Sequence, residues 1–147
     1  MTFSPHITVA CIVEQADRFL FVHEHTRSGM AINQPAGHLE AYETLQQAAL
    51  RETLEETGWD IELTAITGLY LYQAPNGVTY QRLCFAAHPL GQRPGAKLDA
   101  EIIQPLWLTV NELQARQNEW RSPLVMQCLQ DYLAGHRYPL AMLKGIF

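Results

Sequence analysis

Residues 37–59 read GHLEAYETLQQAALRETLEETGW, and this stretch decides the fold class and the chemistry of the chain. From about Glu43 to Thr57 it contains neither glycine nor proline. Its Leu, Gln, Ala, Arg and Glu residues are good helix formers. Gly58 then supplies the glycine that commonly ends a helix. The stretch therefore predicts a helix that begins near Glu43 and ends at Thr57.

The predicted helix carries carboxylates on the face that packs. At about 100° per residue, one stripe of this helix begins with small apolar residues and ends with acids. Its members are Leu45, Ala48, Ala49, Glu52 and Glu56, with Glu55 on its edge. Acids three and four residues apart repel one another, and a helix C-terminus disfavours negative charge. A hard divalent cation with oxygen ligands, such as Mg²⁺, would relieve both costs.

A solvated acidic helix face is the alternative interpretation of these glutamates. It accounts for any single one of them, because acids on helices mostly lie at the surface. It accounts poorly for three together, since a plain surface helix places its acids opposite the core. Arg51 lies one residue before the acids and could pair with Glu43 or hold Glu55 in place.

Strand and helix patterns alternate around the central helix. Strands are expected over residues 7–13, 19–22, 61–72, 78–87 and 106–108. Thr109 and Glu112 form a capping box that begins a short helix. A last helix is expected over residues 122–135. Residues 23–33 are polar and contain Ser28-Gly29, which indicates a loop. This order predicts an α/β fold, with a mixed sheet sandwiched between helices in one domain over residues 1–147.

The composition excludes several classes of protein. Of 147 residues, 48% are hydrophobic and 17% are charged, which excludes a disordered chain. Cys11, Cys84 and Cys128 form an odd and widely spaced set, which excludes a disulfide scaffold and suggests core residues. No apolar run reaches the roughly 20 residues of a membrane span, and the first residues lack the pattern of a signal peptide. A cytoplasmic protein without membrane contact is expected.

The net charge of −5 is concentrated in one segment. Residues 40–62 hold seven acidic residues and one basic residue, a net charge of −6, and the rest of the chain carries +1. An acidic protein is a poor partner for a nucleic-acid polymer, whose binding depends on Lys and Arg. Bound Mg²⁺ would cancel this local charge and attract small phosphate compounds.

The same stretch resembles the sequence signature of the Nudix hydrolase family, G-x5-E-x7-R-E-U-x-E-E-x-G-U, in which U is bulky and aliphatic. Seven fixed positions match at the family's spacing, namely Gly37, Glu43, Arg51, Glu52, Glu55, Glu56 and Gly58. Thr53 and Trp59 depart from the aliphatic positions and leave the carboxylates untouched. The expected strand order is also similar to the Nudix fold across nearly the whole chain.

This resemblance implies Mg²⁺-dependent hydrolysis of phosphoanhydride bonds, with Mn²⁺ as a substitute. The implied metal ligands are Glu52, Glu55, Glu56 and the carbonyl of Gly37. Family members draw a further ligand or base from a loop outside the signature; Glu101 is our candidate, Asp99 the reserve, and a plain loop acid the alternative. A carboxylate that the metal does not fully use, Glu55 or Glu101, would take the proton from the attacking water.

Three further segments resemble one bacterial branch of this family, namely residues 33–40, 121–125 and 137–140. That resemblance implies nucleoside tri- and diphosphates and thiamine-type pyrophosphates as substrates. Arg27 and Arg82 are candidate phosphate contacts, because Arg suits phosphate oxygens, and His38 is a candidate lining residue. For Arg27, a solvated surface position is the competing interpretation. For the aromatic residues Tyr70, Tyr72, Tyr80, Phe85 and Trp107, core packing is expected rather than stacking on a substrate ring.

A non-catalytic Nudix domain that senses a nucleotide or metabolite is the second functional hypothesis. Such domains typically lose signature glutamates or carry another domain, whereas all three glutamates are present here. The expected partner is a small phosphorylated substrate, with no nucleic-acid polymer and no membrane, and the chain acts as a monomer or homodimer. The bond that is cleaved and the preferred substrate stay open.

Overall fold

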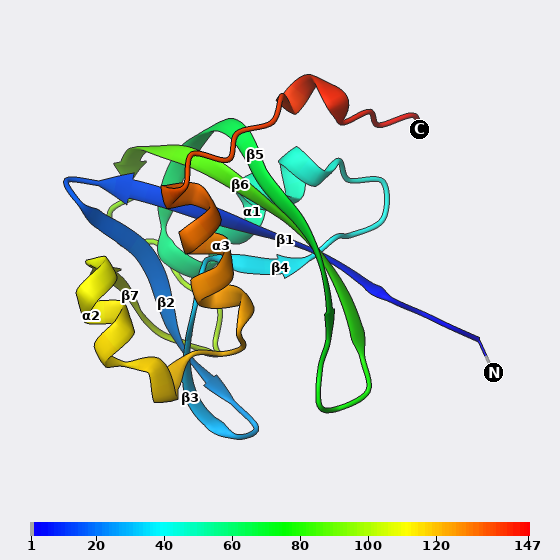
Figure 1. The fold of residues 1–147 in the computed structure, drawn as a ribbon. Helices are drawn as coiled ribbons and strands as arrows, with labels where there is room; N and C mark the ends of the chain where they lie inside the picture. Colours follow the sequence, from blue (N-terminus) through cyan, green and yellow to red (C-terminus); the bar gives the residue numbers. More distant parts are fainter. Residues whose placement is uncertain (1) are drawn as a thin grey trace.

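The computed structural model describes residues 2–147, and it contains a mixed sheet packed between helices (Figure 1). The strands are β1 (His6–Gln15), β2 (Arg18–Thr26), β3 (Gly29–Asn33), β4 (Ala36–His38), β5 (Trp59–Gln73), β6 (Thr79–Gln92) and β7 (Ile102–Leu108). The α-helices are α1 (Leu45–Thr57), α2 (Val110–Ala115) and α3 (Leu124–Leu133). Short 3₁₀ turns cover Gln117–Glu119 and Leu140–Met142. The predicted α/β class is confirmed.

The sheet has seven strands and one parallel pair. Its main path is β3-β2-β1-β6-β5, with β4 paired to β1 and β7 paired to β2. Only the β1–β6 pair among these is parallel. β1 and β2 are joined by a tight hairpin turn, in which Ala16 and Asp17 adopt φ angles of 50° and 66°. Positive φ at two central residues is typical of the turn that fits the twist of a hairpin.

The loop expected over residues 23–33 is instead mostly strand, and this expectation was wrong. β2 continues to Thr26, and β3 follows directly from Gly29. β2 pairs with β3 on one side and with β7, which is distant in sequence, on the other. These neighbours bury His23 and Glu24, whose polarity had suggested exposure to solvent.

Helix α1 forms where the sequence predicts it, and local signals fix both of its ends. Thr44 is the N-cap residue, and it forms a capping box with Gln47. Gly58 ends the helix with φ of 76°, a conformation that favours glycine. The observed start is thus Leu45, slightly later than the expected Glu43.

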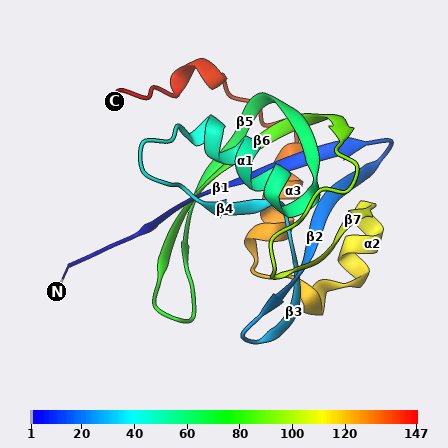
Figure 2. The same cartoon turned by 180° about the vertical axis from the view of Figure 1, so that it is seen from behind.

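Two hydrophobic clusters lie on the two faces of the sheet. One contains Ala48 and Ala49 of α1 together with residues of β1, β2, β5 and β6. The other contains Val125, Cys128 and Leu129 of α3. α3 lies in front of the sheet in Figure 1, whereas α1 lies in front in Figure 2. The apolar stripe of α1 is therefore buried, and Glu56, which continues this stripe, is buried as well.

The C-terminal segment returns to the body of the protein. Tyr138 exchanges two backbone hydrogen bonds with Ile66 of β5, and Leu140 and Leu143 pack on the α1-side cluster. All three cysteines are free and buried, as expected of core residues. Across residues 2–147, no helix has both the length and the apolar character needed to cross a membrane.

Candidate functional site

The C-terminal half of α1 lies against β4. Glu56 is only 5% exposed, and its Oε1 accepts a hydrogen bond of 2.8 Å from the backbone N–H of Ala36. A Cβ placed on Gly37 would lie 2.1 Å from the carboxyl carbon of Glu52. Glycine at this position thus lets the backbone of β4 approach the carboxylates. The segment 35–37 and helix α1 thus form two sides of one site.

Three carboxylates converge at this site. Glu52, Glu56 and Asp99 each offer an oxygen, and these oxygens lie within 4.8 Å of one another. The backbone N–H of Asp99 donates to the carbonyl of Glu55 at 3.0 Å, which ties the segment before β7 to α1. The structure thus brings the reserve candidate, Asp99, to the glutamates. Glu55 and Glu101 lie outside this group of three.

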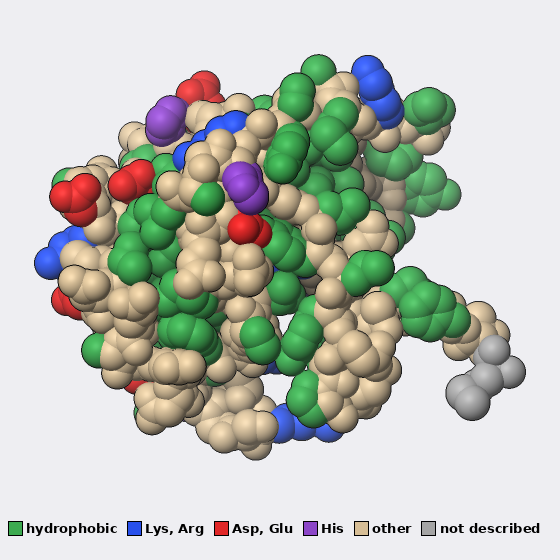
Figure 3. Space-filling model, in the orientation of Figure 1, with side chains coloured by type: hydrophobic (Ala, Val, Ile, Leu, Met, Phe, Trp, Pro, Cys, Tyr) green, Lys and Arg blue, Asp and Glu red, His purple; other side chains and the backbone are tan. Residues whose placement is uncertain are grey.

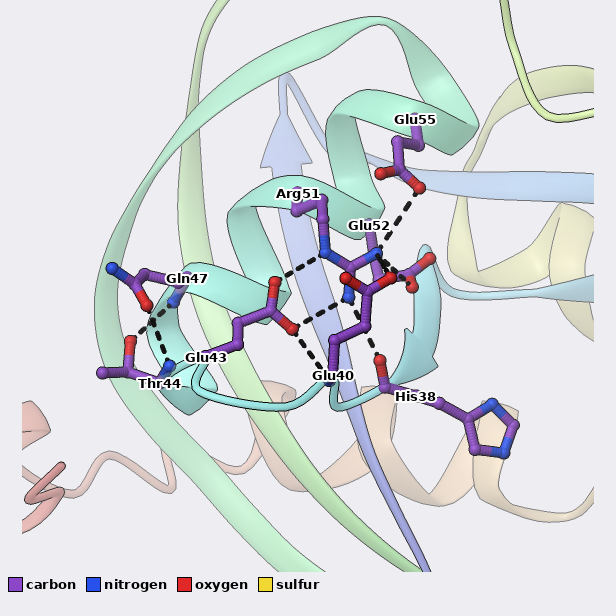
Figure 4. Close-up of polar contacts among 8 residues, drawn as sticks. All are labelled: His38, Glu40, Glu43, Thr44, Gln47, Arg51, Glu52 and Glu55. Carbon is purple, nitrogen blue, oxygen red and sulfur yellow. Dashed lines mark hydrogen bonds and ion pairs between the residues drawn. The ribbon is translucent and has the colours of Figure 1, made fainter. Parts of the chain in front are cut away.

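Arg51 is the centre of an ion-pair network on the outer side of the site (Figure 4). Its Nε donates to Glu43 at 2.6 Å, and its Nη1 donates to Glu52 at 2.7 Å and to Glu55 at 3.4 Å. Its Nη2 donates to the backbone carbonyl of His38 at 3.1 Å. Arg51 therefore makes both of the pairs that the sequence suggested, and it also holds Glu52. The network fixes the carboxylates that face β4.

The surroundings of the three carboxylates disfavour their charged form and raise their pKa values. Burial, helped by the negative charges of Glu24 and Glu52, raises the pKa of Glu56 to about 9. Burial also raises the pKa of Glu52, although Arg51 opposes this shift. The pKa of Asp99 is raised by burial and by neighbouring acids. The protein supplies too little positive charge for these groups.

A divalent cation fits this arrangement. The group of three offers only carboxylate oxygens, which are the ligands that hard cations such as Mg²⁺ and Mn²⁺ prefer. Within residues 2–147, Glu56 forms no ion pair with a cationic side chain, although it is nearly fully buried. A buried carboxylate without a cation is costly unless it is protonated or coordinates a metal.

Glu24 is a buried acid near this site that the sequence analysis missed. It lies on β2, is 6% exposed, and its charge interacts with that of Glu56. Its Oε2 lies 3.3 Å from Nη1 of Arg121. The interpretation of residues 23–33 as a polar loop placed this acid in solvent. The available signal was its position two residues after the apolar strand residues Phe19 to Val22.

Arg82 lies on β6 and is buried under neutral partners. It is 6% exposed, and its Nη atoms donate to Asn33 and Gln34 at 3.2 Å each. Its Nε has no partner within the part of the chain that the structure describes. Asn33 and Gln34 immediately precede the segment that reaches Glu56. The structure thus connects Arg82 to the site through this segment. Within residues 2–147, no carboxylate forms an ion pair with Arg82.

His38 lies in the same row of the sheet as Arg82. It is opposite Thr8 of β1, and Thr8 is opposite Arg82. Residues opposite one another share a face of the sheet, so His38 and Arg82 lie on one face. Their backbones are two strand spacings, about 10 Å, apart. The exposed ring of His38 contacts His6, with 3.1 Å between Nε2 and Nδ1, and Tyr80 lies beside both rings. On this side, the surface is hollowed between the β5–β6 hairpin and the body of the protein (Figure 3).

The other sequence candidates lie apart from this face. Arg27 is exposed at the tip of the β2–β3 hairpin, and no hydrogen bond or ion pair of its side chain is recorded in residues 2–147. Its role in substrate binding stays a prediction. Phe85 is fully buried, and Trp107 packs edge to face on Trp59, as expected of core residues. Tyr72 is half-buried and lies opposite Tyr80.

Raising the pH is expected to destabilise the metal-free protein. The folded pKa of Glu56, about 9, exceeds its ordinary value of 4.5, so the folded state binds this proton more tightly. The resulting stability is fully present below about pH 4.5 and is lost as the pH rises toward about 9. We expect Tm without metal to fall by at least about 5 °C between pH 5 and pH 9. Thermal unfolding followed by circular dichroism measures this change. A Glu56→Gln variant that kept the full slope would contradict the assignment.

Replacing Gly37 by alanine is expected to disturb the carboxylates. The added Cβ would overlap the carboxyl group of Glu52, so either that side chain or β4 must move. We expect the affinity for Mn²⁺, measured by electron paramagnetic resonance, to fall about 10- to 100-fold, the usual cost of disturbing the surroundings of a metal ligand. Gly91→Ala is the control, since a Cβ there meets nothing within 4 Å. Unchanged Mn²⁺ affinity in the Gly37→Ala variant would show that this close approach does not matter.

Comparisons with known proteins agree on one family. A family model described as the NUDIX domain matches residues 4–128. The chain is 41% identical to phosphatase NudJ of Escherichia coli K12 over 142 residues, which cover 96% of this chain and 92% of the relative. A solved NUDIX hydrolase from Nitrosomonas europaea superposes with a TM-score of 0.95 at 43% identity and covers 97% of this chain and 98% of that one. A MutT NUDIX hydrolase from Burkholderia pseudomallei shares the fold, with a TM-score of 0.74 at 17% identity over 87% of this chain and 98% of that one.

Proposed function

Since this chain belongs to the Nudix family and is a Nudix hydrolase, we propose that it hydrolyses phosphoanhydride bonds in nucleoside tri- and diphosphates and in thiamine-type pyrophosphates, with Mg²⁺ as the cofactor. Mn²⁺ is the proposed substitute. One cytoplasmic domain, acting as a monomer or a homodimer, would carry the activity, and nucleic-acid polymers and membranes would not be partners. Small phosphorylated compounds are the substrate class that the family's hydrolases act on.

The convergence of Glu52, Glu56 and Asp99 beside Gly37 carries this proposal. Their oxygens lie within 4.8 Å of one another, and Glu52 and Glu56 belong to the part of the family signature that lies on α1. This group, together with Glu55 and Glu101 close by, is the proposed ligand set, and the Gly37 carbonyl is a further proposed ligand. A bound Mg²⁺ supplies Lewis-acid chemistry there, because it polarises phosphoryl oxygens and makes water more acidic.

The residues around the carboxylates have separate proposed tasks. Arg51 holds Glu52 in place, so the carboxylate is positioned before any ligand arrives. A carboxylate that is not fully occupied takes the proton of the attacking water. Glu55 and Glu101 are the candidates, because both lie outside the group of three.

The organic part of the substrate is proposed to lie on the face that carries His38. His6, His38 and Tyr80 offer ring surfaces there, and aromatic rings suit a nucleobase or a thiazolium ring. Arg82 is the proposed cation of this face. Its buried guanidinium is bound only by neutral groups, so it can still interact with a negatively charged group of the substrate.

A sensor that binds without catalysis is the competing hypothesis. The retained carboxylates argue against it. A module that only binds has no need for three buried or half-buried acids whose oxygens lie within 4.8 Å of one another. Turnover distinguishes the two hypotheses directly.

Phosphate release from a panel of substrates tests the proposal. The panel contains nucleoside tri- and diphosphates and thiamine pyrophosphate, each measured with Mg²⁺, with Mn²⁺ and with EDTA. We expect release with either metal ion and none with EDTA. If no phosphoanhydride were cleaved with either metal ion, the proposed activity would be wrong.

A further inference from the structure

Arg121 is an arginine near the carboxylates that the proposed function does not use. It lies between the 3₁₀ turn Gln117–Glu119 and α3, beside β3. Its backbone N–H donates to the carbonyl of Ile32 at 2.8 Å, and the preceding residue, Trp120, forms a bridge with Ile32. The backbone at Arg121 is thus fixed to the edge of the sheet next to β2.

Glu24 binds the side chain of Arg121. The guanidinium approaches Glu24 through Nη1 alone, at 3.3 Å. The Glu24 side chain is 8% exposed, whereas that of Arg121 is 48% exposed. A guanidinium has five N–H donors, so most of those on Arg121 are free to meet a ligand from solvent. This pair therefore has a buried anchor and an open cationic end.

The Arg121–Glu24 pair lies near the carboxylates of the site. The charge of Glu24 interacts with those of Glu56 and Glu101, so these three acids lie near one another. The backbone supports this placement, because the N–H of His25 donates to the carbonyl of Glu101 at 2.8 Å. Through its contact with Glu24, Arg121 is thus tied to the β2 side of the site.

Arg121 differs in availability from the other two arginines of this region. The guanidinium of Arg51 is occupied by Glu43, Glu52, Glu55 and the carbonyl of His38. Arg82 is only 6% exposed. Of these three, Arg121 alone combines an exposed guanidinium with a single weak contact.

We propose that Arg121 is a substrate-binding residue that contacts the pyrophosphate group, and that Glu24 is a positioning residue that holds it there. This inference rests on the proposed function, since it assigns a further residue to the same substrate. Guanidinium and phosphate form paired, charge-assisted hydrogen bonds. The pair with Glu24 keeps Arg121 in reach of the site, and its free donors bind the phosphate oxygens.

Binding of methylenediphosphonate tests this inference without turnover. This analogue of pyrophosphate cannot be hydrolysed at its P–C–P bridge, and it carries no organic ring. We expect its dissociation constant, measured by calorimetry with Mg²⁺, to rise about 10- to 100-fold in Arg121→Ala, the loss typical of a hydrogen bond to a charged group. Arg121→Lys keeps the charge but loses the fork of donors, so an intermediate loss is expected.

Arg93→Ala is the matched control. Arg93 forms an exposed pair with Asp60, away from the carboxylate group, and the variant should bind the analogue as the unaltered protein does. The role of Glu24 is tested by a double-mutant cycle. If Glu24 acts through Arg121, Glu24→Gln weakens binding in the unaltered background and has no further effect in the Arg121→Ala background. The double variant also avoids a buried, unpaired Glu24, which could otherwise impair folding of Arg121→Ala.

Several outcomes would overturn the inference. One is equal binding of methylenediphosphonate by Arg121→Ala and the unaltered protein; another is no binding by the unaltered protein. A raised KM for a nucleoside diphosphate in Arg121→Ala, with unchanged binding of methylenediphosphonate, would mean that Arg121 contacts the organic group. The binding measurements with methylenediphosphonate are independent of turnover, so a protein that binds the analogue but cleaves no substrate would refute only the proposed function.

Discussion

Glu56→Gln is expected to lower kcat by about 1000-fold, a loss typical of removing a principal electrostatic group from an active site. The amide has nearly the same size and still offers an oxygen to the backbone N–H of Ala36. It lacks the negative charge that a divalent cation needs. The fold should therefore persist while the metal is held poorly. Steady-state phosphate release with Mg²⁺ measures the effect.

Glu62→Gln is the matched control for this exchange. Glu62 lies on β5 and is exposed, so the same chemical change occurs away from the carboxylate group. Its kcat should equal that of the unaltered protein. A Glu56→Gln enzyme with full activity would show that the buried glutamate is not part of the catalytic machinery.

Arg51→Ala is expected to lower the free energy of unfolding by about 3–5 kcal/mol, the cost of breaking a largely buried ion pair. The Arg51 side chain is 21% exposed, and those of Glu43 and Glu52 are 13% exposed each. Without the guanidinium, these two carboxylates face each other's charge with no cation. Urea denaturation of the metal-free protein measures the loss, and added Mg²⁺ should recover part of it.

Arg93→Ala provides the comparison for Arg51→Ala as well. The pair of Arg93 with Asp60 is exposed on both sides, and exposed pairs contribute about 0–1 kcal/mol. If the two variants lost equal stability, the network around Arg51 would be no more than a surface feature.

Local sequence signals predicted the part of the site that lies on α1. The helix follows from its composition and from Gly58, whereas the capping box at Thr44 that sets its start was not among the signals used. The stripe that runs from Ala48 to Glu56 follows from helical geometry alone, and both residues are buried as that stripe requires. The family signature then named the chemistry, and the comparisons confirmed the family.

The parts of the site that come from distant segments could not be predicted in the same way. Asp99 joins Glu52 and Glu56 because its backbone bonds to the C-terminal end of α1, and no local pattern encodes that contact. Glu24 is buried because β2 has partners on both sides, one of which is β7, far along the chain. Polar residues in a strand with such partners resemble a loop when only neighbouring residues are considered.

The residues on the face of the sheet opposite to α1 were partly predictable. Arg82 and His38 were candidates by type, but their common row depends on the register of β4, β1 and β6. The parallel β1–β6 pair joins segments about half the chain apart. A sequence pattern gives the face of each strand but not this register.

Phosphorus-31 NMR of the reaction products tests the central claim most directly, namely that the carboxylates of α1 support metal-dependent cleavage of a phosphoanhydride bond. A nucleoside triphosphate and thiamine pyrophosphate are each incubated with Mg²⁺ and either the unaltered protein or Glu56→Gln. The account predicts new signals of inorganic phosphate or pyrophosphate, and of the matching shortened product, with the unaltered protein only. Unchanged spectra with the unaltered protein, or equal product signals from both proteins, would contradict it.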